Sequence, residues 1–366
     1  MCEHELTVGV VSVDAMTTQR ADFELNRPGA LIAALPAILG FVPEKSLVLV
    51  SLEGGGMGSV LRADLSEDLP DRIEQLAEVA AAARPDAAIV VLVDNEGAQC
   101  PVCNEEYREL CDALSDALAR YGIQRYAAHV VDRVAAGGRW HCVDGCGAGG
   151  PIDDPAASPL AAAAVLEGRR LYARRADLQA VIASDLARSA ALAAAVEKAA
   201  KARAAACDAD PAGRSRRDIE LAMDAAARVI DGQGLGDAEV ALLGCALVDV
   251  RVRDTLYALA VAETADAAEA LWSVLSRLLP PPWRVEALVL LAFSAYVRGD
   301  GPLAGVSLEA ALRCDPQHRM AGILDQALQS GLRPNDIREL AGTGYRLAAQ
   351  LGVRLPPRQD FGRRAG

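Results

Sequence analysis

The chain has 366 residues, enough for two domains of ordinary size, and it carries a formal net charge of −13. Hydrophobic residues make up 52% and charged residues 24%, so the composition excludes a disordered or fibrous protein. The negative charge argues against a general nucleic-acid binder, because phosphate backbones attract basic surfaces. We therefore expect a folded chain of two domains with no nucleic-acid partner.

The N-terminal residues and the cysteine content indicate a cytoplasmic protein. Residues 1–20 contain Glu3, Glu5 and Asp14 and lack the basic start and apolar run of a secretory signal. The sequence has no apolar stretch of about 18 residues that could span a bilayer. Its nine cysteines are an odd number spread over a large chain, unlike the even sets of disulfide-rich secreted domains. We expect a cytoplasmic protein with reduced thiols and no membrane partner.

Residues 1–155 predict an α/β domain. In chain order we expect a strand at 23–25, a helix at 28–39 ended by Gly40, strands at 46–52 and 58–65, a helix at 71–83, a strand at 87–93, a helix from Asn104 to 121, and strands at 125–131 and 139–143. The strand at 87–93 is almost entirely apolar, as expected for a central strand covered on both faces. Strands separated by helices of ten to fifteen residues indicate a mixed, largely parallel sheet.

Residues 156–352 predict an all-α helical domain, because the strand patterns stop and helical spacing continues. The polar segment 208–216 is the clearest break, and Asp218 is placed to cap a helix that runs to Ile230. Further helices are expected from Asp237 and over 265–279, the latter ended by three prolines. Residues 353–366 lack apolar periodicity, so we expect a mobile tail.

Residues 285–316 resemble a tetratricopeptide-like helical hairpin. Ala292 and Ala304 are small residues that would let two helices approach closely, and Gly299-Asp300 would reverse the chain between them. Arg298-Gly299-Asp300-Gly301 also has the composition of an exposed recognition loop. A turn between helices explains it better, because glycine relieves left-handed backbone strain and aspartate caps the next helix.

Longer segments resemble an actinobacterial family catalogued as domain of unknown function 4192. The similar segments are 35–50, which begins with Leu35-Pro36; 139–152, with Arg139-Trp140 and Gly150-Pro151-Ile152; and 296–316, with the Arg298-Gly299-Asp300-Gly301 run. The resemblance extends from about residue 23 to residue 340. It implies an α/β part followed by helices in a soluble bacterial protein. It implies no activity and transfers no catalytic residue.

Complete catalytic motifs are missing from the sequence. The glycine-rich segment 54–58 lacks the Lys-Ser/Thr pair of a phosphate-binding loop, so we interpret it as a hairpin tip. The Gly-x-Ser-x-Gly nucleophile elbow of hydrolases is absent too. These absences lead us to expect a protein that is not an enzyme, without excluding one.

Two cysteine pairs have spacings that suit metal binding or redox chemistry. Cys100 and Cys103 are separated by two residues, and Cys142 and Cys146 by three, which together match a tetrahedral four-thiolate zinc site. If Cys146 points away, Cys111 is the expected replacement ligand. A redox pair at Cys100 and Cys103 is an alternative, because a helix start lowers a thiol pKa. Four unrelated thiols are the third possibility.

Three functions fit these observations. The first is a non-catalytic protein-interaction module, whose helical half binds a protein partner. The second is a small-ligand-binding protein or enzyme with its site at the strand ends of the α/β domain, in the loops after Val93 and Val131. The third is a thiol-based or metal-based sensor that uses Cys100 and Cys103.

Overall fold

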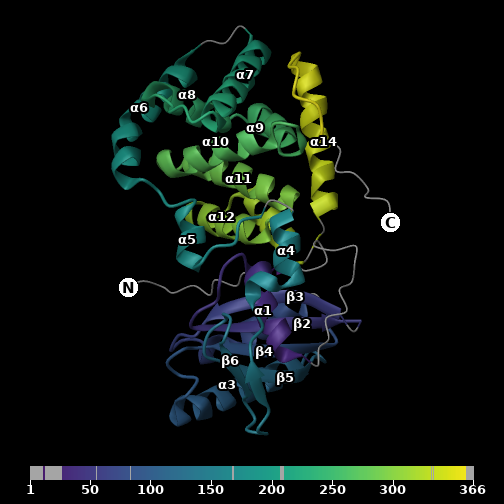
Figure 1. Ribbon diagram of the computed structural model, residues 1–366. Helices are drawn as coiled ribbons and strands as arrows, with labels where there is room; N and C mark the ends of the chain where they lie inside the picture. Colours follow the sequence, from purple (N-terminus) through teal and green to yellow (C-terminus); the bar gives the residue numbers. More distant parts are fainter. Residues whose placement is uncertain are drawn as a thin grey trace. The chain divides into compact units, whose positions relative to one another are not determined.

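The computed structural model describes residues 11–12, 27–54, 56–82, 84–166, 169–206, 210–330, 332 and 334–359. The chain divides into two compact units, one of residues 1–178 with 326–332 and one of 179–325 with 333–366. Every named strand in the described ranges ends by Pro151, and helices follow (Figure 1). The predicted order of an α/β part and then an all-α part is therefore confirmed. The strand expected at 23–25 lies outside the described residues.

The first unit contains one seven-stranded sheet with the strand order β1-β3-β2-β4-β5-β6-β7. Its strands are β1 (Val11–Ser12), β2 (Ser46–Glu53), β3 (Gly56–Asp64), β4 (Ala87–Val93), β5 (Gln124–Val131), β6 (Arg139–Cys142) and β7 (Gly149–Pro151). Its helices are α1 (Pro28–Leu39), α2 (Ile73–Ala81), α3 (Pro101–Ala119) and α4 (Pro159–Leu166), with 3-10 turns η2 (Pro70–Arg72) and η3 (Pro155–Ala157), and α5 (Arg175–Ala180) spans the division between the units.

The sheet is mixed, as predicted, but it is mostly antiparallel instead of largely parallel. Among the strands described, only β4 and β5 pair in parallel. The reason is the β2–β3 hairpin. Strands β3 and β4 run in the same direction across α2, as expected of a strand–helix–strand unit. Strand β2 lies between them, however, because Val48 pairs with Arg62 of β3 on one side and with Val91 of β4 on the other.

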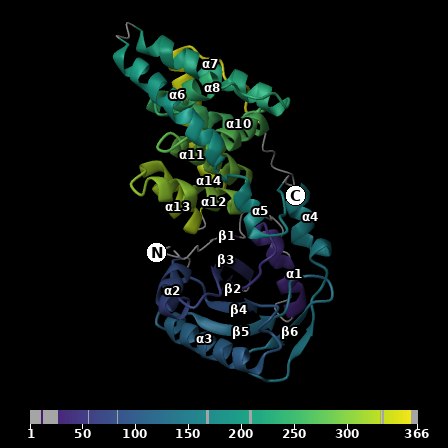
Figure 2. The ribbon, with the colours of Figure 1, turned by 90° about the vertical axis from the view of Figure 1, so that its left-hand side faces the viewer.

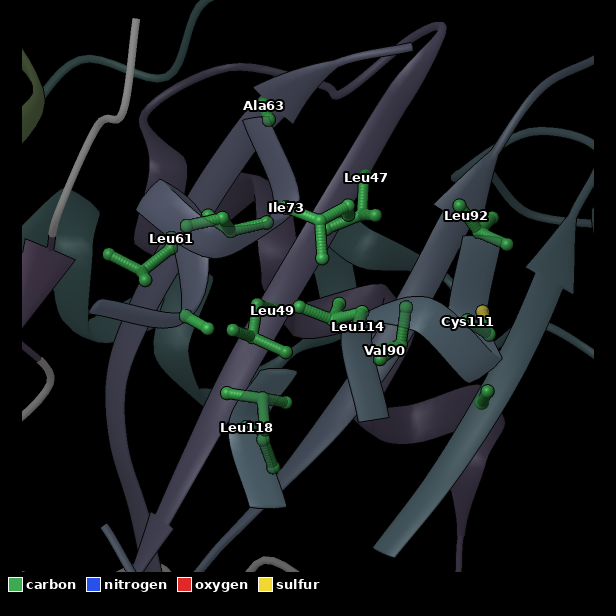
Figure 3. Packing of buried hydrophobic residues seen from close by; sticks show 14 of the residues in the cluster. Leu47, Leu49, Leu61, Ala63, Ile73, Val90, Leu92, Cys111, Leu114 and Leu118 are labelled. Atoms are coloured by element: carbon green, nitrogen blue, oxygen red, sulfur yellow. The ribbon is translucent and has the colours of Figure 1, made fainter. Parts of the chain in front are cut away.

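Helices cover both faces of the sheet (Figure 2). Alternate residues of the central strands, such as Leu49 and Val90, pack with Leu114 and Leu118 of α3 in one apolar cluster (Figure 3). The intervening residues, such as Val48, are buried on the opposite face, where α1 lies. Each such leucine or valine contributes about 1.5–3 kcal/mol relative to an exposed side chain. The sheet therefore holds α3 firmly on one face.

Helix α1 is buried almost all round because α4 packs against it. Past α4, the Nη1 atom of Arg169 donates to the carbonyl oxygen of Ala37 at 3.2 Å, and Tyr172 forms a parallel β-bridge with Phe41. These contacts place residues 156–178 with the first unit, although the sequence pattern of that segment is helical.

The second unit is helical. Its helices are α6 (Leu186–Ala205), α7 (Pro211–Ile230), α8 (Asp237–Leu247), α9 (Val250–Leu256), η4 (Tyr257–Val261), α10 (Ala265–Leu278), α11 (Arg284–Arg298), α12 (Gly301–Cys314) and α14 (Pro334–Leu351), and α13 (Arg319–Gln329) spans the division. Helix α7 begins seven residues before the expected cap Asp218, because Asp210 accepts a hydrogen bond from the N–H of Gly213 and Pro211 fits the first helical position. None of the helices in the described ranges has the length and apolarity to cross a membrane.

The segment Arg298-Gly299-Asp300-Gly301 is a turn between α11 and α12, as predicted. Gly299 adopts the left-handed conformation with φ of 90°, and the Asp300 carboxylate caps α12 by accepting from the N–H of Leu303. Arg298 forms two hydrogen bonds with Glu269 of α10. Because Asp300 is only 5% exposed, the segment is no recognition loop. The similarity of this hairpin to a tetratricopeptide repeat stays a prediction.

The tail predicted to be mobile is described only in part. The N–H of Gln359 donates to the Val261 carbonyl at 2.8 Å, and the Tyr345 hydroxyl donates to the Pro356 carbonyl at 3.0 Å. Residues 360–366 lie outside the described residues.

Helix packing in the second unit gives a test with a matched control. A Cβ atom at Gly344 of α14 would lie 2.7 Å from the Thr255 carbonyl oxygen and 2.8 Å from the Ala258 Cβ, whereas a Cβ at Gly322 of α13 meets nothing within 4 Å. Gly344→Ala should lower the free energy of unfolding by about 1–3 kcal/mol through overpacking. Gly322→Ala should raise it by about 0.5–1 kcal/mol through helix propensity. Urea unfolding measures both, and equal effects would contradict the packing of α14.

Candidate functional site

Cys100 and Cys103 lie at the N-terminus of α3, just beyond the end of β4. Cys100 is the N-cap residue, with φ of −87° and ψ of 119°, and its sulfur accepts a hydrogen bond from the N–H of Cys103 at 3.4 Å. The sequence suggested that the helix starts at Asn104. It starts at Pro101 instead, because proline suits the first helical position and the Cys100 sulfur satisfies a free N–H of the first turn. The pair is therefore built into the helix start.

The two thiols of this first dithiol, Cys100 and Cys103, differ in acidity. A hydrogen bond from the Cys103 thiol, aided by the Cys103 backbone N–H, holds the pKa of Cys100 below its ordinary value. The Cys100 sulfur and burial raise the pKa of Cys103. The positive end of the α3 dipole favours a thiolate at the N-cap further. Cys100 is therefore the more nucleophilic sulfur of the two. Both side chains are only half-buried, so solvent can still reach the Cys100 sulfur.

A carboxylate lies beneath this dithiol. Asp94, which directly follows β4, accepts hydrogen bonds from the Tyr107 hydroxyl at 2.7 Å and the Glu96 N–H at 3.0 Å. Desolvation acts to raise the pKa of Asp94, but these bonds and one from the Gly97 N–H lower it overall. A Cβ at Gly97 would lie 2.0 Å from the Tyr107 oxygen, so this loop needs glycine. Tyr107 follows Cys103 by one helical turn and shares its side of α3.

Asn104 joins the loop, the helix and the sheet. Its Nδ2 lies within hydrogen-bond distance of the carbonyl oxygens of Gly97, Ala98 and Cys100, the shortest at 2.8 Å. Its Oδ1 lies 2.7 Å from Nε2 of His141 on β6. Because the amide nitrogen faces carbonyls, His141 carries its proton on Nε2 and donates to Oδ1. Desolvation lowers the pKa of His141, which favours this neutral form.

Cys142 and Cys146 form a second dithiol at the C-terminal end of β6, directly after His141. Cys142 closes the strand, its N–H donates to the Ala148 carbonyl at 2.9 Å, and Gly145 turns the chain with φ of 71°. The Cys142 and Cys146 thiols are close enough to shift each other's pKa, and the Cys142 thiol lies 4.0 Å from Asp144 Oδ2. The structure thus brings each predicted pair together internally.

The two dithiols do not converge on one point. In the β5–β6 register Cys142 lies opposite His129, and His141 lies opposite Val130. Val130 packs in the cluster with α3, so His141 shares the α3 face and Cys142 lies on the opposite face of the sheet. Strand β6 also runs antiparallel to β5 and carries Cys142 away from the edge where β4 ends.

The structure thus groups the four cysteines of the predicted zinc site two and two. Throughout the described ranges, no three His, Cys, Asp or Glu side chains lie close enough together to hold a metal ion. Cys111, the expected replacement ligand, is fully buried in the apolar cluster (Figure 3), and desolvation raises its pKa to about 12. Zinc binding by these cysteines stays a prediction that the metal content of the purified protein would check.

The alternative site at the strand ends has one further feature. After Val131, the carboxylate of Asp132 accepts hydrogen bonds from the backbone N–H groups of Arg133 and Arg139. A hollow of about 590 Å³ lies at the opposite end of α3, where Asp116, Gln124 and Arg125 contribute to its lining. This hollow lies away from the loops after Val93 and Val131, where a ligand was expected.

Sequence reasoning found the cysteines but missed their neighbours. Asp94, Tyr107 and His141 come from three segments that no motif links. One signal was available, because Tyr107 follows Cys103 by four residues and must share its face of a helix. The roles of Asp94 and His141 depend on the sheet register and on Asn104, which sequence spacing does not show.

Comparison with known proteins adds the family. A family model described as "Domain of unknown function (DUF4192)" matches residues 28–335. The chain belongs to the DUF4192 family. This confirms the resemblance seen in the sequence, and the match includes both dithiols and the α11–α12 turn. No curated protein and no solved structure matches the chain.

The carboxylate beneath the first dithiol gives a prediction about acidity. The Cys100 sulfur and burial raise the pKa of Cys103 most, and the charges of Glu106 and Asp94 add to this, so Asp94→Asn should lower that pKa and allow Cys103 to react at somewhat lower pH. The rate of Cys103 alkylation against pH, measured in a Cys100→Ser background, gives the pKa directly. Glu96→Gln is the control, because Glu96 is exposed and pairs with Lys45. An unchanged pKa in Asp94→Asn, or an equal change in both variants, would contradict this arrangement.

Proposed function

We propose that this member of the DUF4192 family carries out thiol–disulfide exchange at Cys100 and Cys103. One observation carries the proposal: the Cys100 sulfur caps α3, accepts the Cys103 N–H and is hydrogen-bonded to the Cys103 thiol. A Cys-x-x-Cys pair at a helix start favours one thiolate and keeps the second thiol within reach. The thiol-based sensor considered from the sequence is thus the function that the geometry supports best.

The reaction needs only the two cysteines and a partner disulfide. The Cys100 thiolate attacks one sulfur of that disulfide, forms a mixed disulfide and releases the other sulfur as a thiolate. Cys103 loses its proton and attacks the Cys100 sulfur, which releases the second partner thiolate. The products are a Cys100–Cys103 disulfide and two reduced partner thiols, so two electrons pass from the chain to the partner.

The residues around the dithiol favour Cys100 as the attacking thiol and Cys103 as the resolving thiol. The Cys100 sulfur and burial, with a smaller contribution from Asp94, raise the pKa of Cys103, so Cys103 keeps its proton until the second step. Asn104 binds the carbonyl groups of the loop that carries Cys100, and so fixes the sulfur at the helix start. In a compartment that keeps thiols reduced, a disulfide of this kind is transient and is either catalytic or a sensor of oxidants.

Trapping the mixed disulfide tests the proposal. With oxidised glutathione, Cys103→Ser should accumulate glutathione on Cys100, because the resolving thiol is missing, whereas Cys100→Ser should react far more slowly at Cys103. Mass spectrometry of tryptic peptides locates the adduct, since residues 73–108 contain only this pair. Cys314→Ser, which removes an exposed cysteine on α12, is the control and should form the Cys100–Cys103 disulfide normally. Equal adducts on Cys100 and Cys103 would contradict the proposed roles.

A non-catalytic interaction with a protein partner is the second candidate. Leu242, Val248 and Val250 of the α8–α9 region are 53%, 52% and 56% exposed, although they lie within nine residues of one another. Exposed apolar groups of this kind are typical of protein-binding surfaces. Replacing all three by serine should abolish binding of a partner recovered with the full chain, while Leu186→Ser on α6, which is 79% exposed, should not. If the triple variant still binds every partner, this surface is not the binding site.

A further inference from the structure

We infer that Cys142 and Cys146 form a second thiol–disulfide site, which reacts with small disulfides separately from the first dithiol. The backbone already holds the two residues together. The Gly145 N–H donates to the Cys142 carbonyl at 3.4 Å, and the Cys142 N–H donates to the Ala148 carbonyl at 2.9 Å. The turn that joins β6 and β7 thus keeps one thiol beside the other.

The second dithiol differs from the first in its place on the sheet. Cys142 lies on the face opposite α3, as its pairing with His129 shows. The His141–Asn104 bond and the β5–β6 pairing hold the strand in this register. With the strand held in this register, we expect each dithiol to react by itself.

The two sulfurs of the second dithiol are inequivalent. Cys146 is exposed, whereas Cys142 is half-buried, so an oxidant reaches the Cys146 sulfur first. Cys146 is therefore the attacking sulfur and Cys142 the resolving one.

One arginine and two carboxylates lie next to this turn. Asp144 lies between the two cysteines in the sequence, and its Oδ2 is 4.0 Å from the Cys142 sulfur. Arg125 of β5 bonds to Asp144 Oδ1 at 3.0 Å and to Asp112 of α3 at 3.4 Å. The arginine offsets only part of this negative charge, and it ties the turn to β5 and to α3.

The chemistry requires a disulfide as oxidant. The Cys146 thiolate attacks a small disulfide, joins one half as a mixed disulfide and releases the other half as a thiolate. Cys142 gives its proton to solvent and attacks the Cys146 sulfur, and the second half leaves as a thiolate. Because Cys146 faces solvent at a turn, an oxidised low-molecular-weight thiol can reach it without displacing any helix.

Peptide mapping of the full chain separates this site from the first. Trypsin places Cys100 and Cys103 on the peptide 73–108, and Cys142 and Cys146 on the peptide 140–169. The protein is equilibrated in buffers of reduced and oxidised glutathione, and its free thiols are alkylated. Mass spectrometry then gives the mass of each tryptic peptide. We expect the peptide 140–169 to lose both alkylation sites in one two-electron step.

Variants make the result specific. The Cys100→Ser/Cys103→Ser double variant should leave the midpoint of the second dithiol unchanged, because the dithiols are separate. Cys142→Ser should stop the reaction at glutathione bound to Cys146. The inference is overturned if both cysteines stay alkylated across the titration in the wild type, or if either pairs with Cys100 or Cys103. The peptide 73–108, followed in Cys142→Ser/Cys146→Ser, reports independently on the first dithiol.

Discussion

The hydrogen bonds of the Asn104 amide connect the loop after β4, the start of α3 and strand β6. Its nitrogen faces three carbonyl oxygens of the loop after β4, and its oxygen accepts from His141 of β6. A single hydrogen bond contributes about 0.5–1.5 kcal/mol, but an unpaired buried polar group costs more. The amide thus ties the loop, the start of α3 and β6 to one another. The position of the Cys100 sulfur at the helix start follows from it.

The direction of β6 then decides what the cysteines can do. Had β6 run parallel to β5, its end would lie at the same sheet edge as the end of β4, and four thiolates could meet. Because β6 is antiparallel, Cys142 moves away from that edge and alternation turns it to the opposite face. The chain therefore has two separate dithiols, each with one favoured and one disfavoured thiolate.

Local patterns in the sequence predicted individual helices and strands better than they predicted which elements lie next to one another. The apolar run at 87–93 and the Gly299-Asp300 turn gave their elements correctly, because each depends on adjacent residues. The sheet direction did not follow, since inserting β2 between β3 and β4 is a long-range choice. The start of α3 was predicted at Asn104 because asparagine is a preferred N-cap residue, whereas cysteine is an uncommon one. The contacts of Asp94 and His141 depend on the register of the whole sheet.

The reduction potential of the Cys100–Cys103 couple tests the central claim most directly. It is obtained by equilibrating the full chain with mixtures of oxidised and reduced dithiothreitol and weighing the alkylated peptide 73–108. Stabilisation of the Cys100 thiolate favours the reduced pair, so the account predicts one two-electron transition with a potential above about −300 mV, the range of exchangeable disulfides. A potential below that value would indicate a structural disulfide, and failure of the two cysteines to pair would contradict the account.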